Sequence, residues 1–132
     1  MARNDKIKKG NHVILLNDGH IDLEIKKYEI AENYLRKGVQ FGAYNLRNYI
    51  DLSKAYRNLG KISEEETLLL LAVDLIEPAV KRAPKAEKPV KLIEAAVIHH
   101  RLADVYEIQG ELNLSENHLE KEKEYLTEAF NQ

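Results

Sequence analysis

The sequence contains no cysteine among its 132 residues, and it has only three prolines and six glycines. The absence of cysteine excludes disulfides, thiol nucleophiles and cysteine-ligated zinc. Because proline and glycine are the residues that interrupt helices most strongly, their scarcity leaves room for long helices.

Long apolar runs are also missing. The longest one, Leu68–Val73, is far shorter than the ~20 residues that cross a bilayer. The first ten residues are basic and have no apolar stretch beside them, so they do not resemble a secretory signal. We therefore expect a cytoplasmic protein without a membrane partner.

The charge balance is nearly even. Charged residues make up 32% of the chain, which is typical of exposed helical faces, but the formal net charge is only −2. The chain as a whole should therefore not be attracted to nucleic acid. The basic start (Arg3, Lys6, Lys8 and Lys9) could contact nucleic acid, but without interleaved aromatic residues a solvated end is favoured. The length fits a single domain over residues 1–132.

Three short segments share one pattern: glycine, any residue, Ile or Leu, and then a good helix N-cap. They are Gly19–Asp22, Gly60–Ser63 and Gly110–Asn113. Glycine suits the left-handed conformation that ends a helix, and Ser63 with Glu66 and Asn113 with Glu116 have the spacing of a capping box. Each segment therefore predicts a helix end, a tight turn and a new helix.

The first of these segments has a second interpretation. Asn11 to Ile25 could form a β-hairpin, because apolar and alternating stretches flank the favoured turn Asp18-Gly19. The likeness to the two later segments favours helices.

The residues before Gly60 and Gly110 match at identical offsets. They are Tyr49, Leu52, Ser53 and Tyr56 in one copy and His99, Leu102, Ala103 and Tyr106 in the other. Their spacing places each set on one helical face, which we expect to be buried. The small residue, Ser53 or Ala103, lets a neighbouring helix approach closely.

These two stretches resemble the tetratricopeptide repeat. The glycines lie 41 (from 19 to 60) and 50 (from 60 to 110) residues apart, so the spacing is longer than the usual ~34 and more similar to the kinesin light chain type. The chain departs from the family where an alanine is usual early in the second helix. The residues at that position are Glu24, Glu65 and Ser115.

The resemblance implies an all-α fold, a right-handed α-solenoid of three antiparallel helix pairs. The repeats would span about 4–40, 43–83 and 88–130, with six helices near 4–17, 21–40, 43–59, 63–83, 88–109 and 113–130. The leucine-rich fourth helix should be buried on several sides, and the polar sixth helix should face water. The proline-containing residues 77–90 should form a spacer, or a basic loop that contacts a partner.

The resemblance also implies a function. Stacked helix pairs offer an extended groove, so the expected function is the binding of a protein or peptide by an adaptor, chaperone or regulatory module. The expected partner-binding residues lie opposite the apolar stripe and near solvent. They are Arg47, Lys54, Asn58, His100, Arg101 and Asp104. An alternative is that Asp51, Lys54 and Arg57 form ion pairs with Arg101, Asp104 and Glu107 that align the repeats.

No pattern predicts chemistry. His99, His100 and Asp104 lack the converging ligands that zinc needs, and His99 occupies a packing position. No phosphate loop or nucleophile elbow occurs, so we expect no catalytic residue, cofactor or metal. Two rival functions stay open: a subunit that assembles into a homo-oligomer, and a helical-bundle enzyme or ligand-binding protein.

Overall fold

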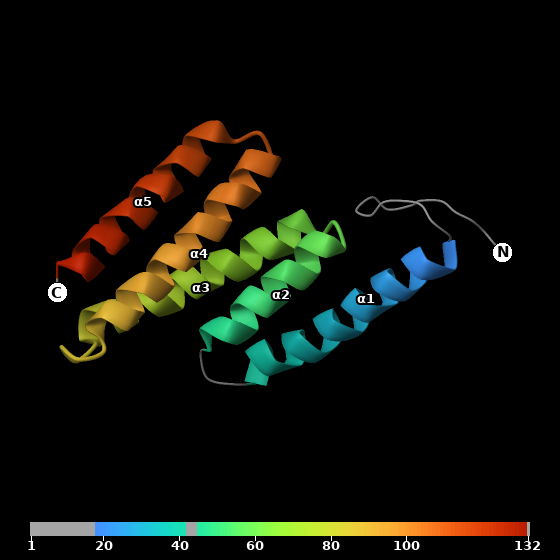
Figure 1. Cartoon of the computed structure of the whole chain (residues 1–132), viewed down its shortest axis with the longest axis horizontal. Coiled ribbons are helices and arrows are strands. Elements are labelled where there is room, and N and C mark those ends of the chain that lie inside the picture. Colours follow the sequence, from blue (N-terminus) through green and yellow to red (C-terminus); the bar gives the residue numbers. More distant parts are fainter. Residues whose placement is uncertain (1–17, 42–44, 132) are drawn as a thin grey trace. The chain divides into compact units, whose positions relative to one another are not determined.

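The structure is a computed structural model that describes residues 18–41 and 45–131, and all regular secondary structure in these ranges is helical (Figure 1). The helices are α1 (Asp18–Phe41), α2 (Leu46–Asn58), α3 (Ile62–Arg82), α4 (Lys88–Ile108) and α5 (Leu112–Phe130). The all-α prediction is therefore confirmed. Within the described ranges, no helix has the length and apolar character needed to cross a membrane.

Five of the six predicted helices have a counterpart, whereas the predicted helix at 4–17 lies outside the described residues. The predicted turn at Gly19–Asp22 is wrong, because α1 already begins at Asp18. The hairpin interpretation is wrong for the same reason, since His20–Ile25 is helical.

The chain divides into two compact units between Glu64 and Glu65. The first unit contains α1, α2 and the start of α3, and α1 packs against α2 as an antiparallel pair (Figure 1). The second unit contains the rest of α3 with α4 and α5, and α4 and α5 form the most extensive helix pair.

In the first unit, the buried carboxylate of Glu32 connects α1 to the turn before α3. It accepts hydrogen bonds from Lys61 Nζ at 2.8 Å and from Arg36 Nη1 at 3.4 Å. The hydrogen bond to Glu32 raises the pKa of Lys61, because it stabilises the charged ammonium. Tyr49 and Leu52 of α2 are buried in this unit, as the matched offsets predicted.

Gly60 and Gly110 end α2 and α4 in the same way, with φ of +74° and +79°. At the end of α2, the backbone N–H of Lys61 donates a hydrogen bond to the carbonyl oxygen of Tyr56, and that of Gly60 donates one to Arg57. The same two hydrogen bonds occur at the end of α4. This is a Schellman motif, and it satisfies carbonyl groups that the helix end leaves free. The predicted helix ends are therefore confirmed at both glycines.

The predicted N-caps are less accurate. α3 begins at Ile62 and α5 at Leu112, so Ser63 and Asn113 lie just inside the helices. At the start of α5 the cap position is Glu111, which makes no side-chain cap hydrogen bond. At the start of α2, Asn45 is a side-chain cap, because its Oδ1 accepts a 2.9 Å hydrogen bond from the N–H of Arg47.

The proline-containing stretch is more helical than predicted. α3 continues through Pro78 to Arg82, and Pro89 lies in the first turn of α4, where proline is tolerated. Only residues 83–87 connect the two helices. The spacer that the sequence predicted over 77–90 is therefore much shorter in the structure.

The core of the second unit follows the predicted faces. Leu69, Leu102 and Tyr106 are buried, as predicted, and Ala103 is buried at the small-residue position. The expectation for α3 is wrong in part, because three of its leucines, Leu70, Leu71 and Leu75, are exposed on the side opposite Leu69. Among the described residues of α5 only Ser115 is buried, which agrees with the predicted polar last helix.

Candidate functional site

Three of the predicted partner-binding residues lie on α2 in the first unit. The Arg47 side chain is largely exposed, and its Nε is 3.7 Å from Asp51 Oδ2, one helical turn away. Asn58 Nδ2 donates a 2.9 Å hydrogen bond to the carbonyl oxygen of Lys54, which is itself exposed. These residues form a polar face on α2, as predicted.

The other three predicted residues lie on α4 in the second unit. His100 connects α4 to α5, because its Nδ1 is 3.1 Å from Glu122 Oε1. Its other ring nitrogen, Nε2, is 3.8 Å from Asp104 Oδ2. His100 and Asp104 are both partly exposed, which agrees with the prediction that they lie near solvent.

Arg101 does not lie near solvent, so this part of the prediction is wrong. Its side chain is 16% exposed, and its Nη2 is 3.3 Å from Oε2 of Glu65, whose side chain is fully buried. A buried carboxylate is costly unless a positive charge and hydrogen bonds compensate it. Arg101 therefore serves the packing of α3 against α4.

This ion pair also explains a departure from the tetratricopeptide pattern. Glu65 and Ser115 occupy the position where the family usually has alanine, and both are buried. Glu65 bonds Arg101, and Ser115 Oγ donates a 2.9 Å hydrogen bond to the carbonyl oxygen of Ala103. At both places a polar side chain with a bonded partner occupies a buried position. The side chain of the third departure, Glu24, lies outside the described ones.

The predicted residues are thus divided between the two units. The alternative ion pairs between α2 and α4 cross the same division and stay predictions. Each unit therefore presents its own group of predicted residues, and in the second unit exposed apolar side chains accompany them.

The outward face of α4 carries an apolar stripe whose apolar members are not among the predicted binding residues. Val90, Ile93 and Val97 are 58%, 44% and 36% exposed. With His100 and Asp104 they follow one another at spacings of three and four residues, so they share one helical face. We refer to these five residues as the α4 stripe. It is apolar at its start and polar at its end.

A column of four aromatic rings lies on the α5 side of α4. The rings of Tyr125 and His99 have centroids 5.6 Å apart, those of His99 and His118 5.1 Å, and those of His118 and Tyr106 5.4 Å, all in stacked orientation. His99 is 2% exposed, so the prediction that it packs in the interior is confirmed.

Polar contacts extend from this column to α3. Tyr125 donates a hydrogen bond of 3.2 Å to Glu77 Oε2, and Tyr106 donates one of 3.0 Å to Glu66 Oε2. Burial and the nearby carboxylate raise the pKa of each tyrosine to about 12. The carboxylate accepts a hydrogen bond from the neutral phenol and repels a phenolate.

The contact between the Nδ1 atoms of the two histidines requires one proton. Nδ1 of His99 is 2.8 Å from Nδ1 of His118, so one nitrogen must donate and the other must accept. Nε2 of His99 is 3.5 Å from Glu77 Oε2, which is long for a hydrogen bond but favours a proton on that nitrogen. The neutral arrangement that fits has His99 protonated at Nε2, with His118 donating from Nδ1.

Burial lowers the pKa of both histidines. For His99 the neighbouring His118 lowers it further, while the Glu77 carboxylate partly offsets these effects. The positive charge of Lys121 on α5 also lowers the pKa of both histidines. Desolvation thus dominates, and it favours neutral rings, which are compatible with the Nδ1–Nδ1 contact.

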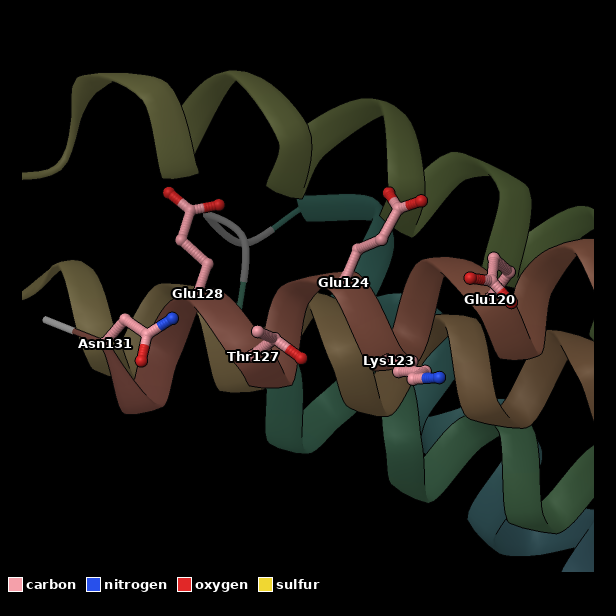
Figure 2. Close-up of a pocket in the computed structure, with 6 residues that line it drawn as sticks. All are labelled: Glu120, Lys123, Glu124, Thr127, Glu128 and Asn131. Carbon is pink, nitrogen blue, oxygen red and sulfur yellow. The ribbon is translucent and has the colours of Figure 1, made fainter.

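The described residues include no group of three His, Asp or Glu side chains placed to hold a metal ion. A depression of about 400 Å³ lies along α5, and the side chains that line it come from that helix and from Asn131 just after its end (Figure 2). The lining residues are Glu120, Lys123, Glu124, Thr127, Glu128 and Asn131. Because one continuous stretch of chain lines it, groups from different elements do not converge there, as they do in an active site.

The chain matches no described protein family, no curated protein and no solved structure.

Proposed function

We propose that the protein is a protein-binding module, used as an adaptor, chaperone or regulatory scaffold, and that the α4 stripe contacts its partner. The observation that carries this proposal is the exposure of Val90, Ile93 and Val97 in one line on α4. Covering such side chains contributes favourably to association, at about 25 cal/mol per Å² of apolar surface removed from water.

The composition of the stripe indicates the kind of partner. The start of the stripe suits apolar side chains, and its end offers the carboxylate of Asp104 beside His100. We expect a partner segment with apolar residues at helical spacing and a basic residue placed to meet Asp104. The tetratricopeptide-like pattern supports this direction, because it would place α4 among the helices that line the groove.

The polar residues Arg47, Lys54 and Asn58 of α2 offer a second contact face on the first unit. Their exposure makes them suitable for a rim, where charged contacts adjust specificity more than affinity. Arg101 differs from them, since its guanidinium is engaged by Glu65. In this proposal Arg101 does not contact the partner but holds α4, which carries the stripe, against α3.

Affinity capture with quantitative mass spectrometry tests the proposal. The tagged full chain, its Val97→Glu variant and its Leu71→Glu variant are compared in an extract of the source cells. Leu71 is an exposed apolar residue of α3 and provides the matched control. We expect Val97→Glu to lose the partners that the wild type and Leu71→Glu both retain. Equal capture by all three proteins would exclude the stripe as the contact surface.

Self-assembly is a second candidate, because α5 also exposes apolar residues. Phe130 is 83% exposed, and Leu112 and Leu119 are exposed as well. If these side chains join two copies of the chain, sedimentation equilibrium should show a mass that rises with concentration. Phe130→Ser should then remain monomeric at concentrations where the wild type associates. A monomeric wild type would dismiss this candidate.

A further inference from the structure

The inner side of α5 is mostly polar, although the apolar Leu126 and Ala129 near its end are also half-buried. Four polar residues, Ser115, His118, Glu122 and Tyr125, follow at spacings of three, four and three residues, so they form one stripe toward α3 and α4. Each makes a polar contact there: Ser115 with Ala103 O, His118 with His99, Glu122 with His100, and Tyr125 with Glu77. Helix pairs are usually held by apolar side chains. The attachment of α5 therefore includes contacts that depend on protonation states.

The histidine contact tolerates one added proton but not two. A first proton can bind Nε2 of His118, and the ring still donates from Nδ1 to His99. A second proton must bind Nδ1 of His99, which is the acceptor in the 2.8 Å contact. Two N–H donors then face each other in a site where His99 is almost fully buried. The contact cannot survive that step.

We propose that His99 and His118 form a pH-sensitive clasp, which holds α5 on α4 at neutral pH and releases α5 when both rings become protonated. Release would expose the side of α4 that α5 covers, including His99 itself. The clasp requires no bound partner, so its test is independent of the proposed function.

Groups on all three helices around the clasp influence it. Glu77 of α3 favours protonation of both rings, whereas Lys121 of α5 disfavours it, and Tyr125 and Tyr106 stack on the two outer faces. The Glu77 carboxylate already accepts a hydrogen bond from the Tyr125 hydroxyl, so it has fewer acceptor positions left for His99. His100 and Glu122 form a second polar contact between α4 and α5, with His100 Nδ1 3.1 Å from Glu122 Oε1.

The direction of the pH effect follows from the lowered pKa values of His99 and His118. A released helix has histidines with an ordinary pKa near 6.5, which bind protons more readily than the clasped rings. Stability from the clasp is therefore fully present above about pH 6.5 and is lost as the pH falls below it. The equilibrium constant for release should rise by up to about tenfold per pH unit for each proton taken up.

Hydrogen exchange of backbone amides, corrected for the intrinsic pH dependence of exchange, measures this release directly. In the wild type, protection of the α5 amides should fall between pH 7.5 and pH 5, and it should fall more than protection in α2. A His99→Phe/His118→Phe variant keeps the stacked rings but cannot bind protons, so its α5 protection should not depend on pH. The matched control His100→Gln leaves the clasp intact and should behave like the wild type.

Two results would overturn the clasp. One is α5 protection that stays constant in the wild type over this range, and the other is an equal fall in the His99→Phe/His118→Phe variant. If that variant does not fold, nitrogen NMR of the wild-type imidazoles decides. We expect protonation at Nδ1 in His118 and at Nε2 in His99 at pH 7.5, and coupled titration of both rings below pH 6.5. Independent titration of both near their ordinary pKa would contradict the clasp.

Discussion

The ion pair between Arg101 and Glu65 makes a sharp prediction about stability. The Glu65 side chain is fully buried, and the Arg101 guanidinium, 16% exposed, approaches it to 3.3 Å. Arg101→Met keeps most of the apolar volume of the side chain but removes the positive charge. The carboxylate is then left buried without this partner, and such a loss typically costs about 3–5 kcal/mol.

Denaturation by urea, followed by circular dichroism, measures this cost. For a chain of this size, about 3–5 kcal/mol corresponds to a fall of roughly 10–20 °C in melting temperature. The matched control is Arg47→Met, which breaks the exposed contact with Asp51 and should cost less than about 1 kcal/mol. The double variant Glu65→Leu/Arg101→Met removes both charges and should regain most of the lost stability.

This reasoning would be refuted if Arg101→Met melted like the wild type, or if the double variant were less stable than Arg101→Met alone. The first result would mean that Glu65 does not need the guanidinium. The second would mean that Glu65 is not destabilising when Arg101 is absent, since its removal would cause a further loss. Either result would mean that the charge of Arg101 is not needed to compensate the buried carboxylate.

Two further predictions concern the glycine turns and the tyrosines. Nothing lies within 4 Å of a β-carbon built at Gly60 or Gly110. Gly60→Ala should therefore cost about 1 kcal/mol of stability through the positive φ alone, and Gly60→Asn should cost less. Equal melting temperatures for the wild type and both variants would contradict this. Tyr106 has its pKa raised to about 12, above the value near 10 in the unfolded chain, so the stability it contributes should be lost as the pH rises from about 10 to 12. Tyr106→Phe should weaken that dependence in thermal melts, and an unchanged slope would show that the hydrogen bond to Glu66 is not its cause.

Local signals in the sequence identified much of the fold. Helical periodicity located five helices to within a few residues, and the glycines identified the two Schellman turns. The same periodicity identified buried positions such as Leu52 and Leu102. These features depend on neighbours within about one or two helical turns, so the sequence contains the information directly.

The errors have equally local causes. At Gly19 the pattern that accompanies the helix ends at Gly60 and Gly110 occurs inside α1, so the pattern alone does not specify a helix end. At Pro78 the helix continues although proline removes one backbone donor, because tertiary packing can outweigh a single unfavourable residue. The leucines of α3 all resemble core residues in the sequence, and only the structure distinguishes buried Leu69 from exposed Leu71.

The candidate site was harder to predict than the fold. The pairing of Glu65 with Arg101 and of His99 with His118 joins residues on different helices, and one sequence alone does not specify which side chains meet. One signal was present for Glu65, because a charged residue at a position expected to be small implies a bonded partner. The exposure of Val90 and Ile93 had no local signal, since apolar residues alone do not show which face is covered.

The most direct test of the proposed function measures whether the partner covers the α4 stripe. Because the chain has no cysteine, Val97→Cys introduces a unique thiol whose alkylation rate reports its accessibility. Asp74→Cys, on an exposed position of α3, provides the control. With the captured partner in excess, we predict that alkylation slows strongly at position 97 and little at position 74. Equal alkylation rates at position 97 with and without the partner would contradict binding through the α4 stripe.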